Sequence, residues 1–273
     1  MYIRLLLTAF AFIVFSTALS AQTDTLPPDF TFKGMAIGIS NPEMIDQMMA
    51  VMPGLGSNAK AMMNEQSVKS YLMPPREVGQ RGTSTSYLLS ACMEFYTNFR
   101  KNYKVNLSPD FVTLSLAREG NQDLKNALRF LVTDGTVSAD IMPYDSPSIP
   151  RSAGATDKYR ITNYLQIFRE THRDAQKVFE VQKALMRGNP VIVEMKTPDG
   201  FEKITDTRFW SSLGKDFNNV LPFMVVGYNL ELEAFEVLSA WGPEWGSDGY
   251  LWVDFDDFGE IAQNGYVMVP AGQ

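Results

Sequence analysis

The stretch Trp241-Gly242-Pro243-Glu244-Trp245-Gly246-Ser247-Asp248-Gly249-Tyr250 follows the pattern W-G-x-x-W-G-x-x-G-Y. It is the most specific motif in the chain, and it leads into Tyr250-Leu251-Trp252-Val253. That run of aromatic and β-branched residues predicts a strand.

The two halves of the chain have different hydrophobic periods. Apolar residues at helical spacing predict helices in the first half, and short β-branched runs predict strands in the second. Helices are predicted over residues 85–103, 124–131 and 174–187, with another starting at Ser108-Pro109, and strands over 191–195, 223–228, 234–238 and 250–253. A helical half followed by a strand-rich half indicates an α+β protein with two lobes.

Six segments carry further motifs, in the order Gln80–Tyr87, Leu107–Val112, Ala127–Tyr144, Ala184–Val193, Leu221–Tyr228 and Ser239–Tyr250. Their motifs and their order resemble those of the papain-like cysteine peptidases. The resemblance spans residues 66–270 of the 273-residue chain. It implies a papain-like two-lobe fold, in which a cleft separates a helical lobe from a β-barrel-like lobe.

The chemistry of that family requires several groups in one site. A cysteine at a helix N-terminus attacks the peptide carbonyl, and a histidine acts first as base and then as acid. An asparagine orients the histidine, while a glutamine side chain and a backbone N–H stabilise the oxyanion. We therefore asked which residues of this chain match those positions.

The resemblance places Gln80 at the oxyanion position, and Ser86, six residues later, at the nucleophile position. Leu221 matches the histidine, and Ser239 matches the asparagine. Trp241 matches the tryptophan that shields the histidine–asparagine hydrogen bond in the family. A serine hydroxyl is a weak nucleophile without a base, and leucine cannot accept a proton.

Three further positions complete the candidate site. Tyr87 takes the place of the tryptophan that follows the family's cysteine, and Gly120 lies in a loose match to its glycine-rich substrate strip. A shift of the match within Gln80–Ser86 would place Ser84 at the nucleophile position instead. Neither serine is a cysteine, so the conclusion about the nucleophile does not change.

Two functions remain open. The first is an exported papain-like pseudopeptidase, catalytically inactive, that binds a peptide or protein in the remnant cleft. The second is an active hydrolase in which Ser86 works with another base. The residue changes indicate loss of proteolysis, because a general base contributes about 10²–10⁴ in rate.

The charge and residue totals exclude several classes of protein. The net charge is -7 and the isoelectric point is about 4.9, which disfavours nucleic-acid binding and adsorption to anionic lipid. The chain has one cysteine, Cys92, and one histidine, His172. We therefore expect no intrachain disulfide, no zinc site of mixed His/Cys ligands and no cofactor.

The single cysteine and the single histidine are candidates for a nucleophile and a base at positions other than the family's. Cys92 lies on the apolar face of the helix that contains Ser86, so the sequence predicts a buried, inert thiol. His172 lies in the charged stretch 169–174 and is predicted to be a solvated surface residue. The acidic cluster Asp254–Asp257 could bind calcium, but it lacks the spacing of a known loop. A solvated strand end or turn is the preferred interpretation.

The N-terminal region is expected to have two parts. Residues 1–21 resemble a secretory signal: Arg4 precedes the apolar run Leu5–Leu19, which is shorter than a membrane span. We expect cleavage, export to the periplasm or beyond, and no membrane span afterwards. Residues 22–66 then form a linker and a methionine-rich helical segment, which either packs on the body or binds a partner. Residues 67–273 form the papain-like domain.

Overall fold

The computed structural model describes residues 36–52, 64–101, 103–119 and 123–271. The chain from Ala36 to Gln273 forms one compact unit. Residues 1–21 and 22–33, the predicted signal and linker, lie outside the described residues, so both remain predictions. Within the described ranges, no helix combines the length and the apolar character needed to cross a membrane.

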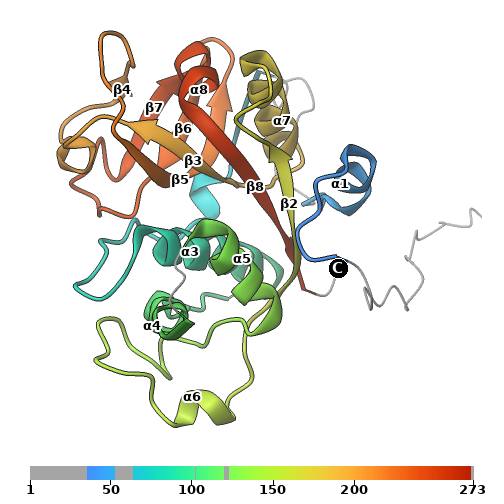
Figure 1. Cartoon of the computed structure of the whole chain (residues 1–273), viewed down its shortest axis with the longest axis vertical. Helices are drawn as coiled ribbons and strands as arrows, with labels where there is room; N and C mark the ends of the chain where they lie inside the picture. Colours follow the sequence, from blue (N-terminus) through green and yellow to red (C-terminus); the bar gives the residue numbers. More distant parts are fainter. Residues whose placement is uncertain (1–35, 53–63, 102, 120–122, 272–273) are drawn as a thin grey trace, which may run out of the picture. The chain divides into compact units, whose positions relative to one another are not determined.

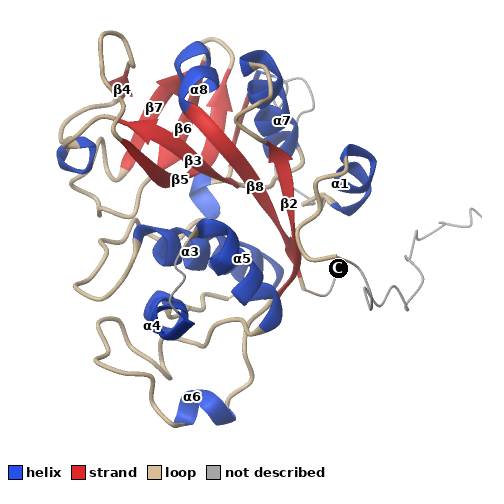
Figure 2. Ribbon diagram, viewed as in Figure 1, coloured by secondary structure: helices blue, strands red, loops and turns tan. Residues whose placement is uncertain are grey.

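The structure combines helices with one large sheet (Figures 1 and 2). The helical segments are α1 Pro42–Met48, η1 Lys69–Tyr71, α3 Ser84–Lys101, α4 Pro109–Glu119, α5 Leu124–Thr133, α6 Ser152–Ala155, α7 Asp174–Met186, η2 Phe201–Lys203 and α8 Phe255–Ile261. The strands are β1 Glu65–Ser67, β2 Ile161–Phe168, β3 Val191–Thr197, β4 Phe209–Trp210, β5 Asn219–Asn229, β6 Ala234–Leu238, β7 Tyr250–Asp254 and β8 Ala262–Pro270. The predicted α+β fold class is confirmed.

The sheet is open. Its strands follow the order β2-β8-β3-β5-β6-β7-β4, with β1 paired to β5, and β4 alone pairs in parallel, with β7. The predicted barrel-like lobe is therefore a sheet with two ends among the described residues. At one end Ile39 covers the edge of β2, exchanging backbone hydrogen bonds with Tyr164 at 3.0 Å and Gln166 at 2.8 Å. A covered edge does not need closure into a barrel to avoid unpaired backbone groups.

The predicted helices are confirmed as α3, α4, α5 and α7. The start of α4 also has the predicted cap, because the backbone N–H of Phe111 donates to Ser108 Oγ at 3.3 Å. The predicted strands are confirmed as β3, β5, β6 and β7. The apolar residues of these elements repeat at regular helical or strand spacing, so the local sequence pattern alone is enough to locate them.

Several elements were missed, of which β2, β8 and α8 are the longest. Strands β2 and β8 contain polar residues such as Asn163, Gln166 and Asn264, which hide the strand period. The acidic cluster was predicted as a solvated strand end or turn, and Asp254 is indeed the exposed last residue of β7, but the cluster also opens helix α8, which was not predicted. Asp254 caps this helix by accepting the backbone N–H of Asp256 at 2.8 Å. Asp257 accepts the side-chain hydroxyl of Ser212 at 2.6 Å.

Helix α3 connects the helices to the sheet (Figure 1). Its buried residues Leu88, Leu89 and Phe95 belong to one apolar cluster with Met224 of β5 and Tyr266 of β8. Because α3 packs against both strands, its first turn is held close to the strands that carry the other candidate site residues. Cys92 is fully buried in the same cluster, as predicted.

The described part of the methionine-rich segment packs on the body. Met49 and Met52 are buried, which confirms the packing interpretation for these residues. Asn189 anchors the segment: its Nδ2 donates to the Ala50 carbonyl at 2.6 Å, and its Oδ1 accepts the Tyr96 hydroxyl at 2.9 Å. Residues 53–63 lie outside the described residues.

Substitution Asn189→Ala should destabilise the protein by about 2 kcal/mol, because it leaves a buried carbonyl and a buried hydroxyl without partners. Chemical denaturation measures this, and limited proteolysis should show earlier cleavage before residue 52. Asn218→Ala is the control, since Asn218 is exposed and its side chain bonds only Asp199. Equal stability of the Asn189→Ala and Asn218→Ala variants would show that the Asn189 side chain does not stabilise the protein.

Candidate functional site

The first turn of α3 decides which serine could act as a nucleophile. Thr83 caps the helix: its Oγ1 accepts the backbone N–H of Ser86 at 3.2 Å and lies 3.0 Å from Ser86 Oγ. Ser86 is the third helical residue and is only 1% exposed. Ser84 is the first helical residue and is half-buried. Of the two hydroxyls, Ser84 is therefore the one at a helix N-terminus that solvent can reach.

The loop that carries Gln80 contacts two acidic residues and also carries Arg81, whose guanidinium donates to the Asp145 carbonyl at 3.1 Å. Gln80 itself is exposed, while Gly79 has no room for a side chain against the Asp145 carboxylate. A Cβ on Gly82 would lie 3.1 Å from Asp110 Oδ1. Two carboxyl groups thus contact the loop in which the family stabilises an oxyanion. Negative charge there opposes the accumulation of more negative charge.

Hydrogen bonds fix these groups in place. The backbone N–H of Gly79 donates to the Tyr87 hydroxyl at 3.3 Å, and the backbone N–H of Asp145 donates to Asp110 Oδ2 at 2.7 Å. Burial raises the pKa of the Asp110 carboxyl, and the Asp145 N–H partly offsets this. Burial likewise raises the pKa of Tyr87. The Asp110 and Asp145 contacts could not be predicted from the sequence, because both residues are distant from the loop in the chain.

The sequence match assigns Leu221 and Ser239 to the positions of the family's histidine and asparagine. Leu221 is half-buried on β5, opposite Met195 of β3. Ser239 is 2% exposed, and its Oγ accepts the backbone N–H of Trp241 at 3.2 Å. Its hydroxyl is therefore used to hold the turn after β6. Neither side chain can take up a proton from a serine at neutral pH.

Trp241 belongs to an aromatic cluster that fills the space beside these residues. Its ring centroid lies 5.5 Å from that of Phe223 and 5.4 Å from that of Trp245. Trp245 is buried, and its Nε1 donates to the Phe201 carbonyl at 2.9 Å. Such edge-to-face packing is a sufficient structural reason for both tryptophans.

The structure brings several of the predicted residues together. Tyr87 and Ser239 line one small hollow of ≈ 20 Å³ where α3 meets the end of β6. Nearby, the backbone of Val78 donates to the Ala240 carbonyl at 2.9 Å, which ties the Gln80 loop to the Trp241 segment. A hollow of this size has room for about one water molecule and none for a ligand side chain. Gly120 lies outside the described residues.

His172 does not supply a displaced base in this arrangement. It lies in the turn between β2 and α7, outside the group of residues just described. The expectation of a solvated histidine is wrong in part: the residue is half-buried, and its Nδ1 is buried without a hydrogen-bond partner. Cys92, fully buried, has its pKa raised by burial and is not a nucleophile.

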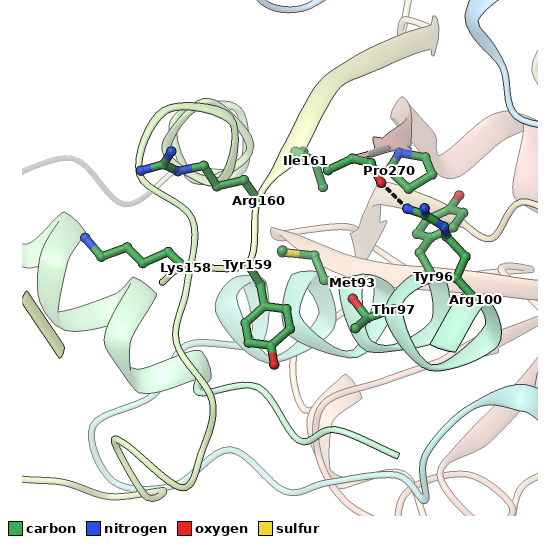
Figure 3. A pocket seen from close by; sticks show the side chains of 10 residues that line it. Met93, Tyr96, Thr97, Arg100, Lys158, Tyr159, Arg160, Ile161 and Pro270 are labelled. Carbon is green, nitrogen blue, oxygen red and sulfur yellow. Dashed lines mark hydrogen bonds between the residues drawn. The ribbon is translucent and has the colours of Figure 1, made fainter. Parts of the chain in front are cut away.

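A larger hollow lies at the opposite half of α3, against residues 158–161 and Pro270 (Figure 3). Three cations line it, but Figure 3 shows Lys158 and Arg160 pointing away from Arg100. Arg100 bonds the Ala271 carbonyl, and Arg160 Nε donates to the Asp134 carbonyl at 3.1 Å. The cations therefore do not converge on one ligand position.

Comparison with known proteins identifies the family. The model of the papain family cysteine proteases matches residues 92–269, which include Leu221 and Ser239 but not the Gln80–Ser86 segment. No curated protein sequence matches the chain.

Solved structures share the fold. Digestive procathepsin L 3 of the Tenebrio molitor larval midgut matches with a TM-score of 0.64 at 16% identity, covering 83% of this chain and 78% of that one. Xylellain, a cysteine protease from Xylella fastidiosa, matches with a TM-score of 0.59 at 17% identity, covering 86% and 96%. A Carica candamarcensis cysteine protease in complex with E-64 matches with 0.59 at 14%, covering 76% and 98%. The chain belongs to the papain family of cysteine proteases.

Proposed function

We propose that this chain is an exported pseudopeptidase, which keeps the papain fold, has lost peptide hydrolysis and binds a peptide or protein. The observation that carries the proposal is Leu221, an aliphatic residue at the position where the family needs a base. Ser86, the hydroxyl matched by counting from Gln80, is buried against Thr83. No proton acceptor is thus supplied from the family's position for either Ser84 or Ser86.

The acidic surroundings of the Gln80 loop support the same conclusion. The loss of a general base costs about 10²–10⁴ in rate, and negative charge beside an oxyanion site opposes the charge that develops in the transition state. In this chain the base position is aliphatic, and Asp110 and Asp145 contact the oxyanion loop. Together these changes remove most of the rate advantage that the fold offers.

Binding of a peptide or protein is supported by apolar residues at the start of β5. Val220 is 46% exposed and Leu221 is half-buried, so both present aliphatic surface. Leu213, in the loop before β5, is 88% exposed. Exposed aliphatic groups in a fold built to hold an extended chain are candidates for contact with a ligand's side chains.

The alternative is a hydrolase based on serine. Ser84 is the stronger candidate nucleophile, because it lies at the first residue of α3 and solvent reaches it. Such an enzyme would need a base from the ligand or from another residue. The proposal of a pseudopeptidase and this alternative give opposite results in one assay.

Purified residues 22–273 should show no hydrolysis of casein or of a mixed fluorogenic peptide library above the buffer rate, because no base activates a serine. Ser84→Ala and Ser86→Ala are assayed beside the wild type, and an active papain-family protease shows that the substrates work. Turnover that Ser84→Ala abolishes would establish a serine peptidase and reject the pseudopeptidase. Export is tested separately, by sequencing the N-terminus of the mature protein.

A further inference from the structure

A hollow of ≈ 280 Å³ lies over one face of β6 and β7, and the proposed function does not use it. Glu236 of β6 and Tyr250 and Trp252 of β7 form its floor. None of the residues at the Gln80, Ser86, Leu221, Ser239 or Trp241 positions lines it.

The strand register explains why the hollow is open. Glu236 lies opposite Trp252, and Leu238 lies opposite Tyr250, so these side chains share one face of the sheet. At the Leu238 end this face is covered by the core that includes α3. At the Glu236 end the hollow is bordered by Lys69 of η1, Arg208 of the loop before β4, and Ser247 and Asp248 of the turn before β7.

The polar wall of the hollow is held rigidly. Glu236 is only 7% exposed, and its Oε1 lies 2.6 Å from Lys69 Nζ. The same ammonium group lies 3.8 Å from the centroid of the Tyr250 ring. Burial and the Glu236 carboxylate raise the pKa of Tyr250 to about 12, so its hydroxyl stays protonated at physiological pH.

The charges of the hollow balance. Lys69 and Arg208 provide two cations, and Glu236 and Asp248 provide two anions. Arg208 and Asp248 are exposed at the rim. An anionic ligand would approach two carboxylates, and a cationic ligand would approach two positive groups. A neutral ligand with many donors and acceptors suits such a set best.

The Trp252 ring that lines the hollow is continued outside it by Phe209. The Phe209 ring stacks on Trp252, with centroids 6.3 Å apart and planes 26° apart. Phe209 is 50% exposed, so a flat apolar surface lies beside charged groups. The planar Arg208 guanidinium lies 5.6 Å from the Phe209 ring centroid, at the edge of the same surface.

We propose that this hollow binds a neutral saccharide unit. Each sugar hydroxyl both donates and accepts a hydrogen bond, so neighbouring hydroxyls can bond carboxylates and cations at once. The C–H face of the ring packs on an aromatic surface such as Trp252. The hollow, at ≈ 280 Å³, is large enough for one sugar ring with bridging waters.

The test uses residues 22–273 and a panel of neutral mono- and disaccharides, with binding detected by saturation-transfer NMR and measured by calorimetry. Arg208→Ala and Asp248→Asn should each raise the Kd at least about tenfold, because each removes a charged hydrogen-bond partner. Asparagine tolerates the left-handed backbone of Asp248, where φ is 57°. Asp206→Asn is the matched control, at φ 51° and outside the hollow.

Each outcome of the binding experiment either supports or overturns the saccharide proposal. Binding of a saccharide that both rim variants weaken and Asp206→Asn leaves unchanged supports the proposal. No binding across the panel overturns it, as does binding that both rim variants leave unchanged. Binding of free amino acids in place of sugars also overturns it, and assigns the balanced charges to a zwitterion. The peptidase assay is independent of all these results.

Discussion

A cysteine introduced at Ser84 should react with a thiol reagent about 100-fold faster than one introduced at Ser86. Ser84 begins α3 and is half-buried, whereas Ser86 is 1% exposed and held by Thr83. A thiol at a helix N-terminus is also more acidic, since the helix dipole favours the thiolate. The thiol of Ser84→Cys should therefore be accessible to the reagent and have a lower pKa than an ordinary cysteine.

The measurement is simple because the native protein offers almost no background. Its single thiol, Cys92, is fully buried, and burial raises the thiol pKa. Wild-type protein should thus react only on unfolding, while folded Ser84→Cys should release one equivalent of chromophore. The pH dependence of the rate then gives the pKa of the new thiol.

Ser115→Cys is the matched control, because Ser115 is half-buried but lies in the middle of α4. Its thiol should be accessible with an ordinary pKa of about 8.5, above that of Ser84→Cys. If Ser86→Cys reacts as fast as Ser84→Cys, the first turn of α3 opens readily, and counting from Gln80 identifies the nucleophile position after all. Neither cysteine should restore hydrolysis while Leu221 remains.

Sequence patterns were enough to predict the fold and most of its elements, but not the residue that begins α3. The order of motifs predicted the fold, and clean periods predicted α3, α5, α7 and the strands around Trp241. A fixed spacing from Gln80 selected Ser86, yet the spacing does not reveal which residue begins the helix. That residue depends on the Thr83 cap, a contact visible only in three dimensions.

The acidic surroundings of the Gln80 loop were hidden for a similar reason. Asp110 was visible as the second residue of a predicted helix, and Asp145 as part of a loop rich in small residues. Their approach to Gly79 and Gly82 arises from tertiary packing, so no local pattern encodes it. Polar residues inside β2 and β8 hid those strands, because their pairing is satisfied by neighbours distant in the chain.

The second large effect concerns the ion pair that connects the Gln80 segment to α3. Glu94 has a side chain with 0% exposure, and both its oxygens accept from Arg76, at 2.9 and 2.8 Å. Its Oε1 also accepts the backbone N–H of Leu107 at 2.6 Å. One carboxylate therefore joins α3, the segment before the site and the segment before α4.

Substitution Glu94→Ala should destabilise the protein by about 3 kcal/mol, because the Leu107 N–H loses its partner and Arg76 loses its carboxylate and keeps only the Asn106 side-chain oxygen. Chemical denaturation at neutral pH measures the loss. Glu94→Gln should cost less, since its amide oxygen can still accept from Leu107. Glu170→Ala is the control: Glu170 pairs with Lys196 at the surface, and its removal should leave stability unchanged.

The pH dependence tests the same carboxyl in another way. Burial raises the pKa of Glu94 above its usual 4.5, and Arg76 only partly offsets this. The folded state then binds more protons than the unfolded state just above pH 4.5, so the stability from this group falls as the pH rises through the folded pKa. Glu94→Gln, which has no such proton, lacks this slope. Wild type should therefore lose stability relative to Glu94→Gln between pH 4.5 and neutrality, and the opposite trend would mean that Arg76 outweighs burial.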